Sequence, residues 1–388
     1  MNSTKPPHVP KNFLNVIKIL LLQSQIFGLI TFNCNEKKFQ RSKTRTLYSV
    51  SLIITYASLI VYSIYKIAII DEPLSIYKTT DTLLLLVNGC YVCTMWACAI
   101  MNQDNLIAFL VKITDFDNQM PSHTIANIRE HTRKRILTGM LIRYPVLILL
   151  ITFLLIAALM NLKNHELVAD AMGYILMVIN SVACHQITEL VLMLKARFHI
   201  LNQQLKTIVV YFKNNVRTVY KSPKNQFLAL SKVCALHHHL TKMVKLFNEV
   251  FGVVLLLMFG ASFVAIVLAF FYCSGALQST KIRWINLFWA LFSCVSFVLD
   301  TIYVCDVCYE TIEEAKKAGE LIHKIESDDH DMRDEIEMFS LQIANEQVEF
   351  NAAGFFPVNF SLLFSIIGGV TTYIIILIQL SATLSDNT

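Results

Sequence analysis

The sequence predicts an all-α integral membrane protein with seven transmembrane helices. Of its 388 residues, 55% are hydrophobic and only 16% are charged, whereas a soluble domain of this size carries about 25% charged residues. The chain also contains seven apolar stretches of the length that a helix needs to cross about 30 Å of hydrocarbon. A protein with so few charges cannot cover its own surface with them, so much of that surface must face lipid.

The predicted spans follow one another along the whole chain. They run approximately from Leu47 to Ile70, Thr82 to Met101, Gly139 to Met160, Leu167 to Leu194, Val250 to Gly275, Ile285 to Cys308 and Asn359 to Ala382. An eighth stretch, Phe13 to Phe32, is long enough to span but is interrupted by Lys18 and several amides. We interpret it as an amphipathic helix in the inner membrane interface; an eighth span is the alternative.

Lysine and arginine residues indicate the orientation of the chain. Residues 1–46, 102–138, 195–249 and 309–358 hold eight, five, ten and four of them, whereas the alternate connections and the tail hold one, one, two and none. Cytoplasmic loops carry this excess of positive charge. The N-terminus is therefore expected in the cytoplasm and the C-terminus outside, the reverse of a G-protein-coupled receptor.

Most of the mass outside the bilayer is expected in the cytoplasm. Residues 1–46 form an N-terminal segment there, and residues 47–308 hold spans 1–6 with the helical connection 195–249. Residues 309–358 are expected to be anchor helices, interrupted by an acidic break at 326–334 and resuming from about Glu335 to Asn351. Residues 359–382 form the last span, and 383–388 form a short extracellular tail. The cytoplasmic helices are a natural place for subunits to hold together.

The last span carries a recognisable motif. It reads Thr372-Tyr373, then five apolar residues, then Gln379-Leu380. This closely resembles the signature of the last helix of insect gustatory receptors, which belong to the insect chemoreceptor superfamily together with the insect odorant receptors. That signature usually ends in Phe, where this chain has Leu380. The size, the number of spans, the orientation and the short external loops resemble the same family over the whole length.

The resemblance implies a tastant-gated, non-selective cation channel assembled as a tetramer of this chain or of related subunits. It also implies the plasma membrane of a sensory dendrite. The family's main sugar branch usually carries Glu where this chain has Ile374, so bitter plant compounds are expected ahead of sugars. A fructose-type sugar-gated channel and a metabotropic seven-helix receptor are the alternatives. A secondary transporter is opposed by the odd number of spans and the lack of detectable repeats.

Four copies of the last span would line the pore. Thr372, Ile376, Gln379 and Leu380 share one helical face through three- and four-residue spacing. A ring of Ile376 and Leu380 side chains would make a dewetted constriction, which is one kind of gate. Gln379 would close the ring by amide hydrogen bonds or present carbonyl oxygens to cations. A plain hydrogen bond from Gln379 to a neighbouring helix is the alternative.

The ligand pocket is expected in the outer half of spans 2 to 6. Aromatic rings with a few amides suit a small, semi-polar organic molecule, although the terminal aromatic residues also fit the membrane-interface belt. The candidate residues are Asn88, Tyr91, Tyr174, Asn180, Tyr272, Trp284, Asn286 and Trp289.

Ionisable residues inside the spans are further functional candidates, because placing them in lipid is costly. His185 and Glu189 lie on the inner half of span 4, and Asp300 lies at similar depth in span 6. We expect a polar cluster whose rearrangement accompanies gating; simple pairing, or exposure to a cytoplasmic vestibule, is the alternative. The two Cys-x2-Cys pairs lie in or at the ends of spans without a second ligand pair, so no metal is expected. No cofactor, enzymatic activity or nucleic-acid partner is expected either.

Overall fold

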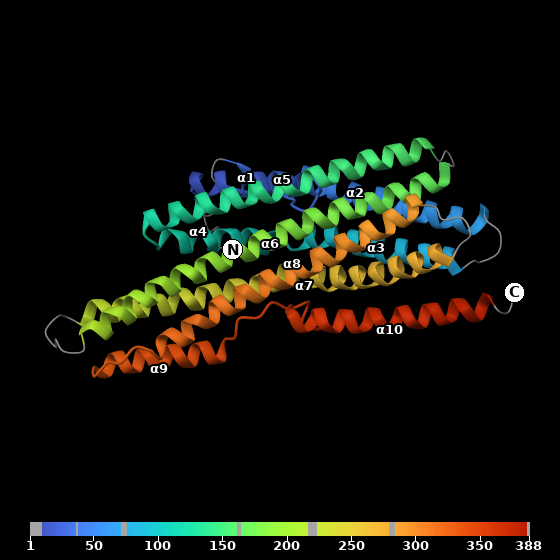
Figure 1. Cartoon of the computed structure of the whole chain (residues 1–388). Coiled ribbons are helices and arrows are strands. Elements are labelled where there is room, and N and C mark those ends of the chain that lie inside the picture. Colours follow the sequence, from blue (N-terminus) through green and yellow to red (C-terminus); the bar gives the residue numbers. More distant parts are fainter. Residues whose placement is uncertain are drawn as a thin grey trace.

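The computed structural model describes residues 10–35, 38–70, 76–160, 164–215, 223–278 and 284–385, and for parts of the helices it describes the backbone alone. The chain forms an elongated bundle whose long helices follow one common axis (Figure 1). Two short strands form an antiparallel hairpin in which Phe32 pairs with Arg41.

The helices have the following bounds. The chain begins with α1 (Lys11–Ile26), β1 (Phe32–Asn35) and β2 (Lys38–Arg41). The long helices are α2 (Lys43–Ile70), α3 (Ile76–Met101), α5 (Ser122–Met160), α6 (Asn164–Asn215), α7 (Pro223–Gln278), α8 (Trp284–Ile322) and α10 (Phe360–Ser385). Two shorter helices, α4 (Gln103–Asn118) and α9 (His330–Asn345), lie between them. Each long helix contains one of the seven predicted spans to within one residue, which confirms the predicted fold class.

Several helices are much longer than a membrane is thick. Helix α7 has 56 residues, about 84 Å at the usual rise of 1.5 Å per residue. The predicted extensions of spans 5 and 6 into long helices are therefore confirmed. Within the described residues, α2, α3, α6, α7, α8 and α10 are long and apolar enough to cross a membrane. The third predicted span lies in α5, where many side chains fall outside the described residues.

The second anchor helix begins and ends earlier than predicted. We expected it from Glu335 to Asn351, whereas α9 runs from His330 to Asn345. The acidic residues taken as a break start the helix, because negative charge is favourable at a helix N-terminus, and Asp331 lies in the first turn. Phe350 and Asn351, which were predicted to end the helix, belong instead to a turn in which the Val358 N–H bonds to the Phe350 carbonyl at 2.8 Å.

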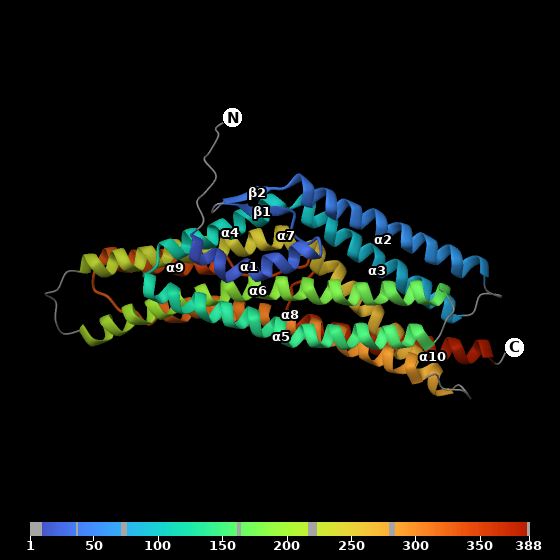
Figure 2. The same cartoon turned by 90° about the horizontal axis from the view of Figure 1, so that it is seen from above.

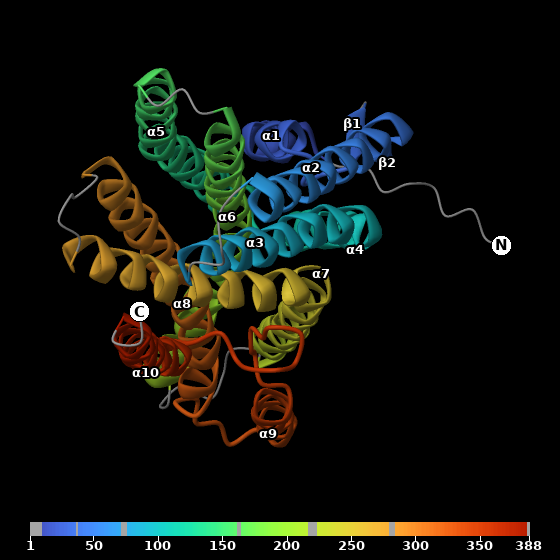
Figure 3. The ribbon, with the colours of Figure 1, turned by 90° about the vertical axis from the view of Figure 1, so that its right-hand side faces the viewer.

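Helix α6 lies inside the bundle and α10 lies at its edge. In the most apolar stretch of each helix, 83% of the residues are buried in α6 but only 6% in α10. Viewed along the bundle axis, α7 and α8 separate α10 from α1, α2 and α5 (Figure 3). Helix α10 therefore packs against α7 and α8 on one side. Described residues leave most of the rest of its surface uncovered.

The N-terminal elements pack onto the same bundle. The hairpin lies beside α4 at the start of α2 (Figure 2), and α1 packs against α5 and α6. Phe13, Ile17 and Leu20 of α1 are buried, whereas Ile26 is exposed. The helix has 16 residues, fewer than the roughly 20 needed to span. Its location at the inner interface stays a prediction.

Candidate functional site

A chain of polar side chains crosses four helices in the middle of the bundle. The Tyr91 hydroxyl of α3 donates to Asn180 Oδ1 of α6 at 2.8 Å, and Asn180 Nδ2 donates to Asp300 Oδ2 of α8 at 3.0 Å. Arg143 of α5 lies 3.7 Å from the Asp300 carboxylate and donates to the Ser181 carbonyl at 2.6 Å. Two predicted ligand residues thus join a predicted gating residue in one polar chain.

Helices α5 and α6 meet through contacts that repeat every four residues. Arg135 Nε and Nη2 donate to Glu189 Oε2 at 3.1 and 2.9 Å. One turn further along each helix, a Cβ added at Gly139 would lie 2.7 Å from Cε1 of His185. The next turn holds the contact between Arg143 and Ser181. Because the numbers rise on α5 as they fall on α6, the two helices run antiparallel in a fixed register.

The two carboxylates among the gating candidates have different partners. Glu189 pairs with Arg135 and Asp300 with Arg143, so each carboxylate has its own arginine on α5. His185 is buried between these pairs, and its Nε2 has no hydrogen-bond partner among the described residues. The predicted polar cluster therefore extends to α5, and sequence reasoning missed the two arginines. The signal was Arg143 itself, because a cation inside an apolar span calls for a carboxylate partner.

The remaining ligand candidates divide into two groups. Asn88 is buried one turn from Tyr91, and its Oδ1 has no hydrogen-bond partner among the described residues. Tyr272 is half-buried near the far end of α7. The side chains of the other four candidates lie outside the described residues; they are Tyr174, Trp284, Asn286 and Trp289.

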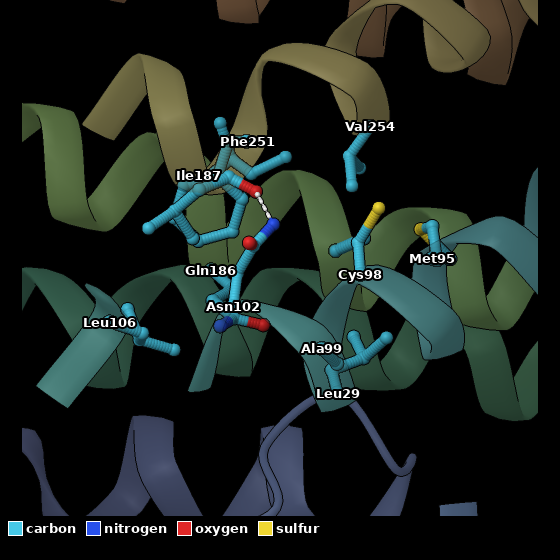
Figure 4. Close-up of a pocket in the computed structure, with 12 residues that line it drawn as sticks. Leu29, Met95, Cys98, Ala99, Asn102, Leu106, Gln186, Ile187, Phe251 and Val254 are labelled. Carbon is cyan, nitrogen blue, oxygen red and sulfur yellow. Dashed lines mark hydrogen bonds between the residues drawn. The ribbon is translucent and has the colours of Figure 1, made fainter. Parts of the chain in front are cut away.

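A small cavity lies where α3 passes into α4. Its volume is about 30 Å³, room for one or two water molecules and far below the 300–1,000 Å³ usual for ligand pockets. Figure 4 shows Gln186 of α6 and Phe251 of α7 in its wall. Asn102, between α3 and α4, donates through Nδ2 to the Val250 carbonyl of α7 at 3.2 Å (Figure 4). The hydrogen bond beside this cavity links the α3–α4 junction to α7.

One face of α10 packs on α7. Leu363, Ile366, Val370, Ile374 and Leu377 recur at three- and four-residue spacing and pack on the core. Tyr373 makes an edge-on contact with Phe263, with ring centroids 5.7 Å apart. A Cβ at Gly369 would lie 2.9 Å from the Phe263 ring, whereas one at Gly368 would meet nothing within 4 Å. Gly369 thus allows the close approach to α7, and Gly368 faces away.

The residues predicted to line a pore lie on the other face. Thr372, Ile376 and Gln379 are exposed, and the Thr372 hydroxyl donates to the Gly368 carbonyl of its own helix at 2.9 Å. The Leu380 side chain lies outside the described residues. The rest of the chain therefore leaves the described part of this face open.

The region predicted to lie below the membrane contains a buried charge pair. Asp117 of α4 accepts from Arg197 Nε and Nη2 of α6 at 3.1 Å each, and Arg129 of α5 lies 3.4 Å away. The side chains of Asp117 and Arg197 are 1% and 3% exposed. Together with Arg129, this pair joins three helices, and sequence reasoning did not single it out.

A buried histidine lies in the same region, in the part of α7 that precedes the predicted span. His237 stands edge-on to Phe198 of α6 and Phe339 of α9, with centroids 5.5 Å from each. Burial lowers the pKa of His237 to about 4, because the charged imidazolium would lose its hydration there. The ring is therefore neutral at pH 7 and acts as a packing residue. Among the described residues, no group of three or more His, Cys, Asp or Glu side chains could hold a metal ion.

Comparison with known proteins places these features in context. A family model described as 7tm chemosensory receptor matches residues 17–383. The Drosophila melanogaster gustatory receptor for bitter taste 66a is 28% identical over 161 residues, which are 39% of this chain and 30% of that receptor. The gustatory receptor for sugar taste 43a of the same species is 25% identical over 165 residues, 41% of this chain and 38% of that receptor. The chain thus spans about a third of the length of the curated relatives it matches.

Two solved structures match a larger part of this chain than these relatives do. The insect olfactory receptor OR5 from Machilis hrabei in complex with eugenol superposes with a TM-score of 0.69 at 16% identity, covering 95% of this chain and 100% of that one. A second structure of OR5 from Machilis hrabei gives a TM-score of 0.71 at 16% identity, and it also covers 95% of this chain and 100% of that one. At this identity, the likeness shows that the fold is shared.

Proposed function

Because the chain belongs to the 7tm chemosensory receptor family, as the motif of its last span predicted, we propose that it is a gustatory receptor that works as a ligand-gated, non-selective cation channel. The observation that carries the proposal is the open face of α10. A helix with 6% of its apolar stretch buried contributes little to its own subunit. Its exposed face carries Thr371, Thr372 and Gln379, polar residues better suited to a pore or a subunit contact than to lipid.

A pore built from this face would close by dewetting. Ile376 is exposed one turn from Thr372, and a ring of Ile376 with Leu380 would narrow the outer part of the pore. Hydrophobic constrictions of this kind stop ion flow when water leaves them. Gln379, on the same face, would offer amide oxygens to a passing cation. Neutral oxygens without a fixed negative ring favour a channel that admits several cations.

The assembly would be a tetramer of this chain or of this chain with related subunits. Large apolar side chains are exposed in α9, at one end of the molecule, and in the connection from α9 to α10. They include Phe355, which is 77% exposed, and Met338 and Leu341 of α9. Exposed apolar groups in an aqueous region mark interaction surfaces. Contacts between copies at this end would hold four α10 helices around one axis.

The ligand would be a small organic tastant that enters near Asn88, Tyr91 and Asn180. The buried Asn88 Oδ1 lacks a partner among the described residues, and a ligand hydroxyl or N–H would supply the missing donor. One relative is a gustatory receptor for bitter taste and another is a gustatory receptor for sugar taste, at similar identity to this chain. Ile374 in place of the sugar branch's Glu favours a bitter plant compound, and a fructose-type sugar is the second candidate.

The orientation follows from the charges of the connections, with the N-terminus in the cytoplasm and the C-terminus outside. A receptor for external tastants would lie in the plasma membrane, in the dendrite of a sensory neuron. The ligand region would then face the outer half of the bilayer, and the end with α9 would face the cytoplasm.

Voltage clamp of cells that express only this chain tests the proposal. Caffeine, quinine and fructose would be applied first with G-protein signalling intact and then with it blocked. We expect a cation current whose ion selectivity or block changes in Gln379→Ala, with Gln203→Ala, at an exposed cytoplasmic position, as the matched control. A current that requires second messengers and ignores Gln379 would identify a metabotropic receptor instead.

A further inference from the structure

The connection between α9 and α10 contains a compact turn, residues 350–358, which we call the linker turn. The Val358 N–H bonds to the Phe350 carbonyl at 2.8 Å, and the Ala352 N–H bonds to the Phe356 carbonyl at 3.0 Å. Asn351 and Pro357 form a β-bridge between these bonds. Phe350, Ala352 and Val358 have no exposed surface. The linker turn is therefore a packed unit, and α10 begins two residues after it.

Two residues of α7, one turn apart, hold this unit. Asn248 Nδ2 donates to the Glu349 carbonyl at 2.7 Å, and its Oδ1 accepts from the Asn351 N–H at 3.3 Å. A Cβ added at Gly252 would lie 2.8 Å from the backbone nitrogen of Ala353. Because the opposing atom is backbone, a side chain at 252 can be accommodated only if the linker turn moves.

The linker turn also holds an unusual backbone conformation. Ala353 has φ +53° and Gly354 has φ +79°. The left-handed region is uncommon for a residue with a side chain and persists where the surroundings enforce it. Here the surroundings include the two bonds to Asn248, the contact with Gly252, and a bond inside the turn from the Gly354 N–H to Asn351 Oδ1 at 2.9 Å.

The same stretch of α7 is held from a second side. The Phe247 ring packs against Phe350 of the linker turn, with centroids 5.3 Å apart, and against Phe109 of α4 at 6.2 Å. Asn102, at the α3–α4 junction, bonds to the Val250 carbonyl. Residues 247–252 of α7 therefore contact both the α3–α4 junction and the linker turn.

We propose that Asn248 and Gly252 are positioning residues that couple α10 to the rest of the bundle through the linker turn. A shift of α7 or of the α3–α4 junction moves the linker turn as one body, and α10 follows because it starts two residues later. This inference deepens the proposed channel function and rests on it: Asn248 and Gly252 set how strongly ligand binding in the bundle acts on the α10 gate.

Gly252→Ala is the direct test, and Gly260→Ala is its matched control. Both positions lie on α7, but a Cβ at Gly260 would meet nothing within 4 Å. Asn248→Ala is the second variant, because it removes two bonds without adding atoms and so does not depend on tolerance of a clash. Each would be expressed as the full chain, and currents evoked by caffeine and by fructose would be divided by the number of molecules at the cell surface.

We expect Gly252→Ala to shift the half-maximal probe concentration about tenfold, within the usual range of coupling between sites. Asn248→Ala should shift it in the same direction, and Gly260→Ala should match the unmodified chain. A purely structural role would lower the surface amount and leave the half-maximal concentration unchanged, which would overturn the inference.

Cryo-electron microscopy of the same variants separates this inference from the proposed function. Displacement of α10 relative to α7 in Gly252→Ala but not in Gly260→Ala supports the coupling, whether or not a current is seen. If the unmodified chain conducts and Gly252→Ala leaves both the current and the place of α10 unchanged, the inference is wrong and the channel function stands.

Discussion

Asp117 and Arg197 show how strongly single residues hold the part of the bundle outside the predicted spans. Both side chains are almost fully buried, and removing the Asp117 charge leaves the buried Arg197 guanidinium without its carboxylate partner. We predict that Asp117→Asn destabilises the folded protein by about 3–5 kcal/mol, the range for breaking a buried pair. The apparent melting temperature of the protein in detergent measures this. Glu130→Gln, which breaks the exposed pair with Lys134, should leave the melting temperature nearly unchanged.

His237 predicts a loss of stability on acidification. Its pKa in the folded state is about 4, below the usual 6.5, so between these pH values the unfolded state binds more protons. The free energy of unfolding is therefore highest above pH 6.5. It falls as the pH drops towards 4, by up to about 3 kcal/mol for this one residue. We expect His237→Leu to reduce the drop in melting temperature between pH 7.5 and pH 5.

His323→Leu is the control for this prediction, because His323 is exposed near the end of α8. That variant should show the same drop in melting temperature between pH 7.5 and pH 5 as the unmodified chain. If the melting temperature of the His237→Leu variant depends on pH as strongly as that of the unmodified chain, His237 does not cause the loss of stability in acid.

Among the helices, the register of α5 against α6 depends on contacts spaced by four residues. We predict that Arg135→Gln sharply reduces the amount of folded receptor, because it leaves the buried Glu189 carboxylate unpaired. The exchange Arg135→Glu with Glu189→Arg should recover part of the loss, since it restores opposite charges at the same place. Surface labelling and detergent gel filtration measure both effects, and Lys134→Gln, on the exposed side of the same turn, serves as control. Failure of the exchange to recover any folded receptor would argue against the pairing.

The sequence predicted the helices better than the contacts between them. Apolar stretches of membrane length located all seven long helices, because length and hydropathy are local properties of the chain. The partners of Glu189 and Asp300 were missed because they depend on the register between α5, α6 and α8, which no local pattern records. The linker turn was also missed. Gly354 and Pro357 are residues that favour turns, but the conformation of the linker turn depends on the space that Gly252 leaves on α7.

For the whole molecule, the exposed apolar surface predicts that several copies of the chain assemble. Phe355 is 77% exposed in the connection between α9 and α10, and burying it between copies would remove apolar surface from solvent. We predict that the solubilised receptor has four times the mass of the 44.2 kDa chain. Phe355→Glu should shift it towards single chains, whereas Phe355→Leu should keep the assembly. Light scattering coupled to gel filtration gives the masses, and a single-chain mass for the unmodified protein would contradict the tetramer.

The open face of α10 is the central claim, and its accessibility to a thiol reagent during channel activity tests it most directly. Cysteine would replace Thr372 and Ile376 on the open face and Ile374 on the face that packs against α7. A charged, membrane-impermeant thiol reagent would be applied from outside during a caffeine- or fructose-evoked current. The unmodified chain controls for the native cysteines. We predict that the reagent blocks the current at positions 372 and 376 but not at 374. Block at 374 alone, or equal insensitivity of all three, would show that α10 does not line the pore.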